Sequence, residues 1–371
     1  MVPNLFVDYK TVQRRIAGIK PTAYARTRNH LDGSVTHLSA FITHGIVSTA
    51  AIARVVLKSH SANSSEKFLS ELAWREYFHR FWQVNGNDIF TDLKQAQEQV
   101  SSDQLPDAIA KASTSIKAID TALYALKTTG YMHNHARLWL AALICNIGHT
   151  HWYQPSRWLY YHLLDGDLAS NSLSWQWVVG TFNHRKYIAN QNNLNRFSET
   201  EQHNTFLDVS YEELANIPTP EVLRTGIDVD LSNTFPESTA LPVTSSSEPI
   251  FLYSIWNLDP DWHRGHSGKR ILWIEPEMHN EFALSPLRWK FVKHWADAID
   301  GLSIFVGNKE TLFPSGTDHL TVYTREYPAT THWPGRRDER DWCYELPDGT
   351  LKSFSNYWRK VRKTSGLFTG E

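Results

Sequence analysis

The spacing of apolar and polar residues predicts helices in the first half of the chain. Residues 114–128 place aliphatic side chains on one helix face, namely Ile116, Ile119, Leu123 and Leu126, and Gly130 follows as a helix C-cap. Residues 64–84 also have helical periodicity, but their stripe at i, i+3, i+4 and i+7 mixes charged and aromatic side chains: Glu71, Trp74, Arg75 and Phe78. This stripe indicates either a surface helix with an i,i+4 ion pair or a helix that lines a binding site.

The second half of the chain has a different pattern. Short apolar runs at 250–256, 270–276, 302–307 and 319–323 predict buried strands, and residues 285–299 predict a helix between them. Strands that alternate with a helix indicate a small parallel α/β domain. Residues 241–249 have the Ser and Pro content of a linker. We therefore predict a mainly α protein, in which a helical domain (1–200) and a linker (201–249) precede a smaller α/β domain (250–371) that ends in a basic helix.

Composition narrows the class of protein. The chain has 371 residues, of which 41% are hydrophobic, and this is enough for two domains with sizeable cores. Its apolar runs are too short to span a bilayer, and its first residues lack the apolar core of a signal peptide, so we expect a soluble cytoplasmic monomer with no membrane partner. Two cysteines, Cys145 and Cys343, cannot hold a four-cysteine iron–sulfur cluster, and we expect no metal. The net charge of −2 does not by itself indicate a nucleic-acid binder, although a local basic face would suffice.

Residues 129–177 contain three features that packing alone does not explain. Asn134 and Arg137 share a helix face at i and i+3, and two aspartates bracket Gly166 shortly before Asn171. Three tryptophans, Trp152, Trp175 and Trp177, lie in the same stretch. An Arg and an Asp beside apolar residues suggest a partly buried ion pair, which needs further hydrogen bonds to persist. A flat heteroaromatic ligand with a polar edge would supply them.

These features lie in sequence blocks that resemble a known family. The blocks are SVTHLS (34–39), FLSELAWREYF (68–78), TGYMHNHAR (129–137), DGDLASN (165–171) and WQW (175–177). In this order and spacing they resemble the FAD-binding domain of the photolyase/cryptochrome family. The resemblance implies an all-helical, photolyase-type FAD-binding domain in the first part of the chain, with FAD as cofactor. It leaves open whether a second, antenna chromophore is bound, because the family's α/β domain normally precedes the FAD domain and here the α/β segment follows it.

The resemblance also implies which residues bind the cofactor. By match to the family, Arg75 and the 34–39 loop bind the diphosphate, an Arg137–Asp165 ion pair lies against the isoalloxazine ring, Asp167 binds its polar edge and Asn171 faces N5. Val35 and His37 depart from the family's Thr and Arg. An ordinary helix cap in the loop, and an Asn171 that caps its own backbone, remain the structural alternatives. The implied cofactor-binding residues are Tyr24, Thr36, His37, Leu38, Ser39, Arg75, Arg137, Asp165, Gly166, Asp167 and Asn171.

Substrate and electron-transfer residues follow from the same match. Trp152 and Trp175 match two members of the family's electron relay, while its third member is either Tyr124 or Trp158, or the relay is short. The residues that match the pocket for a flipped cyclobutane pyrimidine dimer are Glu71, Trp74, Met132, Asn134 and Trp177. Arg185 and Lys186 either contact DNA phosphates or lie in a solvated loop. The implied catalytic residues are Glu71, Trp74, Trp152, Asn171 and Trp175.

The resemblance therefore implies a light-dependent deoxyribodipyrimidine photo-lyase, a flavoprotein that binds damaged DNA. Two other functions stay open at this point. One is a cryptochrome-like blue-light sensor without repair activity, and the other is a helical DNA-binding protein that has lost its flavin.

Overall fold

The computed structural model describes residues 3–243, 245, 247–317, 319–346 and 351–368. Positions 244 and 246 of the predicted linker, and 318, 347–350 and 369–371 of the predicted α/β domain, lie outside the described residues. The chain forms two units. The helical unit is built mainly from Lys20–Thr36 and Phe78–Leu231, and the sheet unit from Asn4–Ile19, His37–Tyr77 and the described residues from Ser232 onward. Each unit is described by itself.

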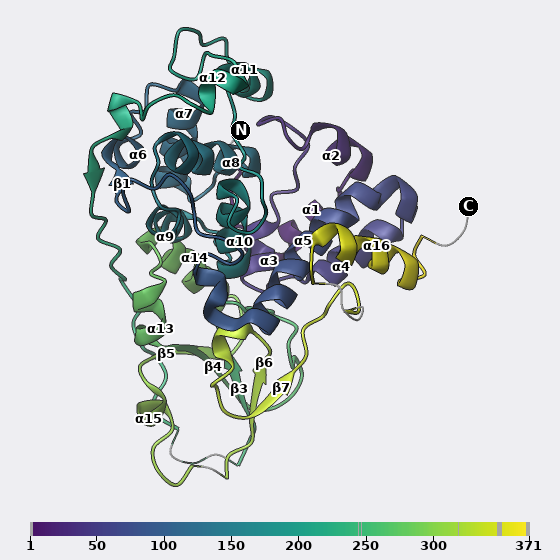
Figure 1. Cartoon of the computed structure of the whole chain (residues 1–371). Coiled ribbons are helices and arrows are strands. Elements are labelled where there is room, and N and C mark those ends of the chain that lie inside the picture. The colour runs from purple at the N-terminus through teal and green to yellow at the C-terminus, as the bar shows by residue number, and fades with distance from the viewer. Residues whose placement is uncertain (1–2, 244, 246, 318, 347–350, 369–371) are drawn as a thin grey trace. The chain divides into compact units, whose positions relative to one another are not determined.

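Most of the regular secondary structure of the helical unit is helix (Figure 1). Its elements are α2 (Pro21–Thr27), the end of α5 (Ala62–Asn85), η1 (Gly86–Phe90), β1 (Leu105–Pro106), α6 (Asp107–Lys111), α7 (Lys117–Thr129), α8 (Asn134–Ala142), η2 (Leu143–Ile147), α9 (Tyr153–His162), α10 (Leu168–Val179), α11 (Gln191–Ser198), α12 (Tyr211–Leu214), η3 (Glu221–Leu223) and β2 (Gly226–Ile227).

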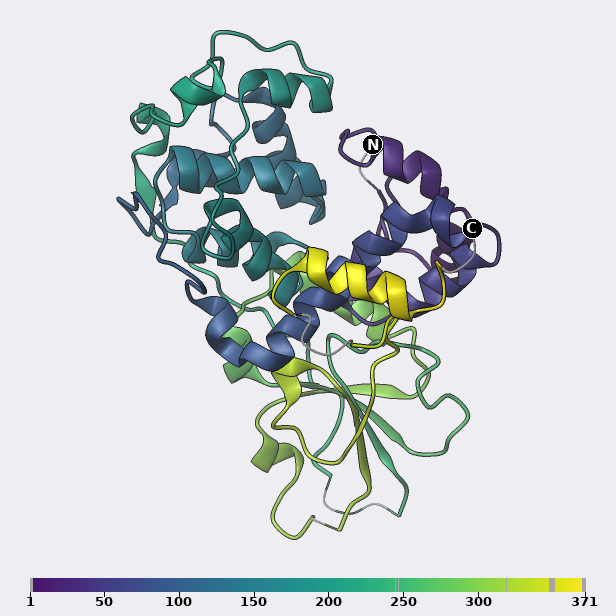
Figure 2. The same cartoon turned by 45° about the vertical axis from the view of Figure 1, so that its right-hand side comes forward.

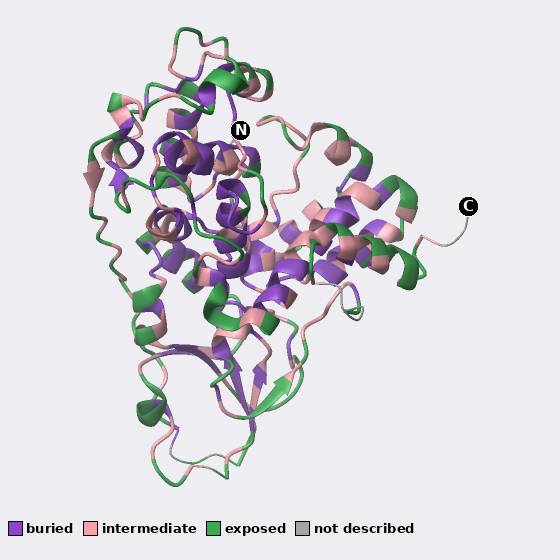
Figure 3. Cartoon of the chain, in the orientation of Figure 1, coloured by how far each residue is buried: buried purple, intermediate pink, exposed green. Residues whose placement is uncertain are grey.

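The core of the helical unit confirms the predicted inward face of α7. Ile116, Ile119, Leu123 and Leu126 are all buried, in one cluster with the apolar side chains of α8, α9 and α10 (Figure 3). Gly130 ends α7 in the left-handed conformation, with a φ of 69°, as its C-cap position predicts. The helix α8 runs on into a π-helical turn, η2. The aliphatic periodicity of the sequence therefore correctly predicts which face of α7 packs into this core.

Part of the predicted linker packs on the helical unit. Leu207, Leu214 and Leu223 are buried in its core cluster, and β2 pairs with β1 as a two-stranded antiparallel sheet. The unit is therefore not purely helical, and the chain that closes it reaches Leu231. These boundaries differ from the predicted ones at 200 and 249 because three leucines, spread thinly among polar residues, bury their side chains there.

The sheet unit contains the predicted parallel sheet and the helices around it (Figure 1). Its elements are α1 (Tyr9–Ala17), α3 (Ser39–Thr43), α4 (Thr49–Leu57), the start of α5, β3 (Ile250–Tyr253), β4 (Lys269–Ile274), α13 (Pro276–Glu281), α14 (Pro286–Ala296), β5 (Leu302–Val306), α15 (Lys309–Leu312), β6 (Val322–Arg325), η4 (Pro328–Thr330), β7 (Arg336–Asp338) and α16 (Phe354–Thr364). All four strands predicted from apolar runs are present, and so is the predicted helix between them.

The sheet has the strand order β5-β4-β3-β6-β7, and every pairing in it is parallel. Leu252 of β3 lies opposite Ile271 of β4 on one side and Thr324 of β6 on the other. Every residue of β3 is buried, as expected for a central parallel strand that is covered on both faces. The chain reverses its direction of travel across the sheet at β3, which makes the β3/β6 boundary a topological switch point.

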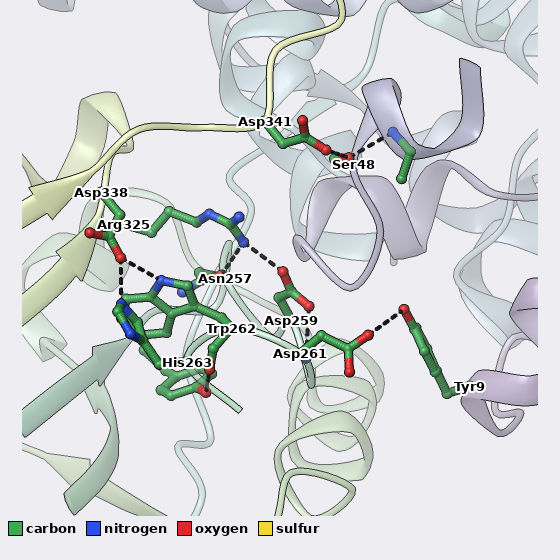
Figure 4. A network of polar contacts seen from close by, with 12 residues as sticks. Tyr9, Ser48, Asn257, Asp259, Asp261, Trp262, His263, Arg325, Asp338 and Asp341 are labelled. Atoms are coloured by element: carbon green, nitrogen blue, oxygen red, sulfur yellow. Dashed lines mark hydrogen bonds and ion pairs between the residues drawn. The ribbon is translucent and has the colours of Figure 1, made fainter. Parts of the chain in front are cut away.

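Ligands of open parallel sheets bind beside such a switch point, at the carboxyl ends of the strands. Here that edge carries polar side chains that bond to one another (Figure 4). Arg325, the last residue of β6, donates to Asn257 at 3.1 Å and to Asp259 at 2.8 Å. Asp338, the last residue of β7, accepts from Trp262 at 2.8 Å. The segment after β3 is therefore fastened to β6 and β7 by charge-assisted hydrogen bonds.

In the described part of the chain, no helix combines the length and the apolarity needed to cross a bilayer.

Candidate functional site

The predicted ion pair between Arg137 and Asp165 is present in the helical unit. Two of the sequence blocks meet where the Leu164 backbone N–H donates to the Gly130 carbonyl at 2.9 Å. Arg137 donates through Nη2 to both carboxylate oxygens of Asp165, at 2.8 Å each, and through Nε to the Met132 carbonyl at 2.9 Å. The two charged side chains are 22% and 6% exposed, so the pair is partly desolvated and these hydrogen bonds offset that cost.

Asp167 begins α10 and contacts a histidine that the sequence reading missed. Its Oδ1 accepts from the Ser170 backbone N–H at 2.8 Å as an N-cap, and its Oδ2 lies 2.7 Å from Nε2 of His79. Both side chains of this Asp–His contact are buried. The sequence did hold a signal, because His79 continues the stripe of Glu71 and Arg75 at i+4 intervals along α5.

Helix α10 presents three of the predicted residues in three different environments. The Asn171 amide donates through Nδ2 to the Ser156 carbonyl of α9 at 3.0 Å, so it ties two helices together and does not cap its own backbone there. Trp175 is buried at 2% exposure, whereas Trp177 is 38% exposed and lies 5.9 Å from the Tyr187 ring. All fifteen tryptophans of the chain fall in its described part, and Trp177 alone among them is classed as exposed.

The predicted electron-relay tryptophans lie in one core. Trp152 and Trp175 are buried in the same cluster, and Trp152 donates through Nε1 to Asp92 at 2.7 Å. Trp158 is buried in that cluster as well, whereas Tyr124 is 68% exposed. Core membership therefore favours Trp158 over Tyr124 as the third relay residue, and the relay itself stays a prediction.

The other predicted substrate and DNA residues of this unit differ in exposure. Met132 is buried, whereas Asn134 is exposed at the first position of α8. Arg185 is exposed, and the half-buried Lys186 donates to the Gln99 side chain at 3.2 Å. Asn134 and Arg185 thus have the accessibility that a contact with DNA requires.

Four further positions of the helical unit are either predicted site residues or lie beside one in sequence. Tyr24 of α2 and Thr36 are half-buried, and Gly166 is buried between the two aspartates. Burial raises the pKa of Tyr131, beside Met132 in sequence, to about 12, so its phenol stays neutral at physiological pH.

The sheet unit contains the rest of the predicted diphosphate loop. His37 has a φ of 52°, Leu38 is buried and Ser39 begins the five-residue helix α3. Arg75 donates through Nη1 to Thr43 Oγ1 at 2.9 Å, and Thr43 is the last residue of the helix that follows the predicted diphosphate loop. Burial, and then the charge of Arg15, lower the pKa of His37, so its ring is neutral at pH 7.

Glu71 and Trp74, the predicted substrate residues of α5, have neighbours that the sequence did not predict. Lys67, which is outside the predicted stripe, forms an i,i+4 ion pair with Glu71 at 2.6 Å. The ring of Trp74 stacks on Phe354 of α16, with centroids 3.6 Å apart and planes inclined by 11°. The C-terminal helix therefore covers one face of the tryptophan that the family match places in the substrate pocket.

The chemistry of these groups fits FAD. A guanidinium beside a hydroxyl group suits a diphosphate, and Arg75 and Thr43 of α3 supply that pair. The half-buried Arg137 and the buried Asp165 and Asp167 have donors and acceptors of the kind that suit the polar edge of a flavin ring. No group of His, Cys, Asp and Glu side chains suited to a metal ion occurs among the described residues.

Comparison with known proteins agrees with this chemistry. Residues 68–237 match the family described as the FAD binding domain of DNA photolyase. A deoxyribodipyrimidine photo-lyase from Streptomyces griseus is 29% identical over 160 residues, which cover 43% of this chain and 35% of that protein. The enzyme of the same name from Escherichia coli is 26% identical over 161 residues, which cover 41% of this chain and 34% of that protein. This chain spans about a third of the length of these relatives.

Two solved structures are also similar. A cryptochrome from Synechocystis has 21% identity and a TM-score of 0.46 over 60% of this chain and 49% of its own. A class III photolyase from Agrobacterium tumefaciens has 20% identity and a TM-score of 0.43 over 51% and 44%.

Residues 68–237 are thus similar to a photolyase-type FAD-binding domain, and FAD is the cofactor of such a domain. The matched segment makes up less than half of this chain.

Proposed function

We propose that this protein is a light-dependent DNA photolyase that splits cyclobutane pyrimidine dimers. When bound, reduced FAD supplies the photoexcited electron donor, and the protein supplies position and electrostatics. The names of the matched relatives support a photolyase, and the pocket residues support the dimer as its substrate.

One observation carries this proposal, and it is the exposure of Trp177. A large apolar ring left 38% exposed, on the same helix as Asn171 and the buried Trp175, suits a platform on which a flipped base stacks. A stack of this kind contributes about 1–3 kcal/mol per base. The remaining tryptophans are buried or half-buried, so α10 offers this surface at one defined place.

The other residues have roles that follow from their contacts. Arg137 holds the Asp165 carboxylate in one orientation, and His79 does the same for Asp167. Asn171 is held by its bond to Ser156, which leaves its carbonyl oxygen as a fixed acceptor. These are pre-oriented groups of the kind that bind a polar ring edge without reorganisation.

The test is repair in the light. Purified, reduced protein whose flavin content has been measured should remove dimers from an oligonucleotide only when it is illuminated. Trp177→Ala should weaken binding of the dimer by about 5- to 150-fold, as expected for a loss of about 1–3 kcal/mol. Trp177→Phe keeps a stacking ring and should retain most of the affinity. No light-dependent dimer loss in the wild type would refute the proposal.

A second candidate function, a light sensor without repair activity, is favoured by the Phe354 contact. A stacked phenyl ring occupies one face of Trp74 and keeps a base from stacking there. In a sensor, Trp74→Ala and Glu71→Gln should leave flavin photoreduction intact. Neither the wild-type protein nor the two variants should repair dimers. In a photolyase, the same two substitutions should abolish repair.

A further inference from the structure

The C-terminal helix α16 has one strongly basic face. Residues 351–368 contain Lys352, Arg359, Lys360, Arg362 and Lys363 and no acidic residue, in a chain whose net charge is −2. Arg362 pairs with Glu66 of α5 at 3.1 Å. Lys352, Arg359 and Lys363 are exposed, and no carboxylate of the described residues lies within ion-pair distance of them. We call these three residues the outward cations.

Helix stability does not explain this charge pattern. Cations stabilise the carboxyl end of a helix, where the macrodipole is negative, and this accounts for Lys363 in the last turn. Lys352, however, lies just before Ser353, the N-cap residue, where a positive charge is unfavourable. The first turn also lacks the acidic residue that would favour the helix. A polyanionic partner gives the outward cations a common role that folding does not.

The opposite face of α16 decides which polyanion fits. Tyr357 and Val361 are each 1% exposed, and Phe354 stacks on Trp74 of α5. A helix that lies on a lipid surface must bury its apolar face in the membrane. In α16 that face is already packed on rings of α5, through the contacts of Phe354 with Trp74 and of Tyr357 with Tyr77. Figure 2 shows the ribbons of α16 and α5 side by side. The exposed cations alone remain available, and they suit the phosphates of a nucleic-acid backbone.

We propose that α16 is a DNA backbone-binding helix, and that Arg359 and Lys363 of the helix, together with Lys352 just before it, contact phosphates. The proposal deepens the proposed function by naming a contact surface for the DNA. Arg359 and Lys363 are one helical turn apart, which places their side chains about 5–6 Å from each other at the base. Such contacts are sequence-independent, so undamaged duplex suffices to detect them.

The experiment compares two charge reversals of equal size in the full chain. Arg359→Glu/Lys363→Glu changes the outward face of α16, and Lys10→Glu/Arg14→Glu makes the same change at exposed i,i+4 positions of α1. Binding of a fluorescently labelled, undamaged DNA duplex is measured by anisotropy in the dark at several salt concentrations. A duplex of about 30 bp is long enough for several phosphate contacts. Thermal unfolding of each variant verifies that it is folded.

The α16 variant should bind at least about tenfold more weakly at low salt. Its slope of log K against log salt should be smaller by about 1.8, or 0.9 for each of two lost contacts. The α1 variant should stay within about twofold of the wild type, since only net charge changes there. Arg359→Gln/Lys363→Gln, a milder change, should fall between them. Equal losses in both reversal variants, or no loss in the α16 variant, would overturn the proposal. A protein that binds duplex through α16 but repairs no dimer would refute only the proposed function.

Discussion

Replacing Phe354 by alanine would uncover Trp74. The two rings stack at 3.6 Å, with their planes 11° apart, and α16 supplies the phenyl group. If a base of the dimer stacks on the same face of Trp74, Phe354 must first move away from it. The free energy needed to separate Phe354 from Trp74 then lowers the apparent affinity of the protein for the dimer. Aromatic pairs contribute about 0.5–1.5 kcal/mol beyond the area they bury. Phe354→Ala should therefore raise the affinity for dimer-containing DNA by about 2- to 13-fold.

The assay is a dark binding titration with dimer-containing and undamaged oligonucleotides, since their ratio isolates the pocket from general DNA affinity. Phe368→Ala is the matched control, because it removes a phenyl ring that packs on Trp358, another residue of α16, at 5.7 Å. The control should leave the ratio unchanged. A ratio that is also unchanged in Phe354→Ala would show that Trp74 does not receive a base, and would favour the sensor.

Three further predictions concern stability. Asp167→Asn weakens a buried hydrogen-bond acceptor that contacts both the α10 backbone and His79. The free energy of unfolding in urea should therefore fall by about 2–4 kcal/mol, and an unchanged urea midpoint of unfolding would contradict this reasoning. Glu76→Gln weakens the hydrogen bonds from Thr49 Oγ1 at 2.5 Å and from the Cys343 backbone N–H at 2.6 Å. The free energy of unfolding in the same assay should fall by about 1–3 kcal/mol, and a smaller loss would count against this reasoning. Burial, and then Lys127, lower the pKa of His162 from 6.5 to about 4. The unfolded chain therefore takes up the proton first, and stability should fall by about 3 kcal/mol between pH 6.5 and 4. His162→Asn should flatten that part of the pH profile.

Much of the helical unit was readable from the sequence because its signals are local. The inward face of α7 needed only aliphatic residues at helical spacing, and the C-cap needed only Gly130. The Arg137–Asp165 pair joins residues 28 positions apart, and the resemblance to a family placed them together before the structure did. In the sheet, the apolar runs predicted the strands, since a central parallel strand such as β3 is buried on both faces.

The contacts that the sequence did not predict join residues far apart in the chain. Phe354 reaches Trp74 across 280 positions, and no local pattern marks that pairing. The Asp92–Trp152 bond and the burial of Leu223 are of the same kind, since a side chain in a loop or in a three-residue helix has no periodicity that would reveal its partner. The predicted domain boundaries at 200 and 249 were based on composition, and composition carries no information about contacts between residues far apart in the chain.

The position of α16 depends on an anchor that lies outside the helix itself. Glu76 of α5 accepts from the backbone N–H groups of Cys343 and Tyr344, and Asp341 accepts from Ser48 and Arg54 of the α4 region. Hydrogen bonds to Arg54 and Ser48 outweigh burial and lower the pKa of Asp341, so the carboxylate is ionised at physiological pH. These bonds fix the segment after β7 to α4 and α5, and the last bonded residue, Tyr344, lies ten positions before the start of α16 at Phe354. The same helix, α5, thus bears Glu76 as the anchor and Trp74 as the ring that α16 covers. Because the anchor and the covered ring are two residues apart, a change that loosens the anchor should also loosen the cover over Trp74.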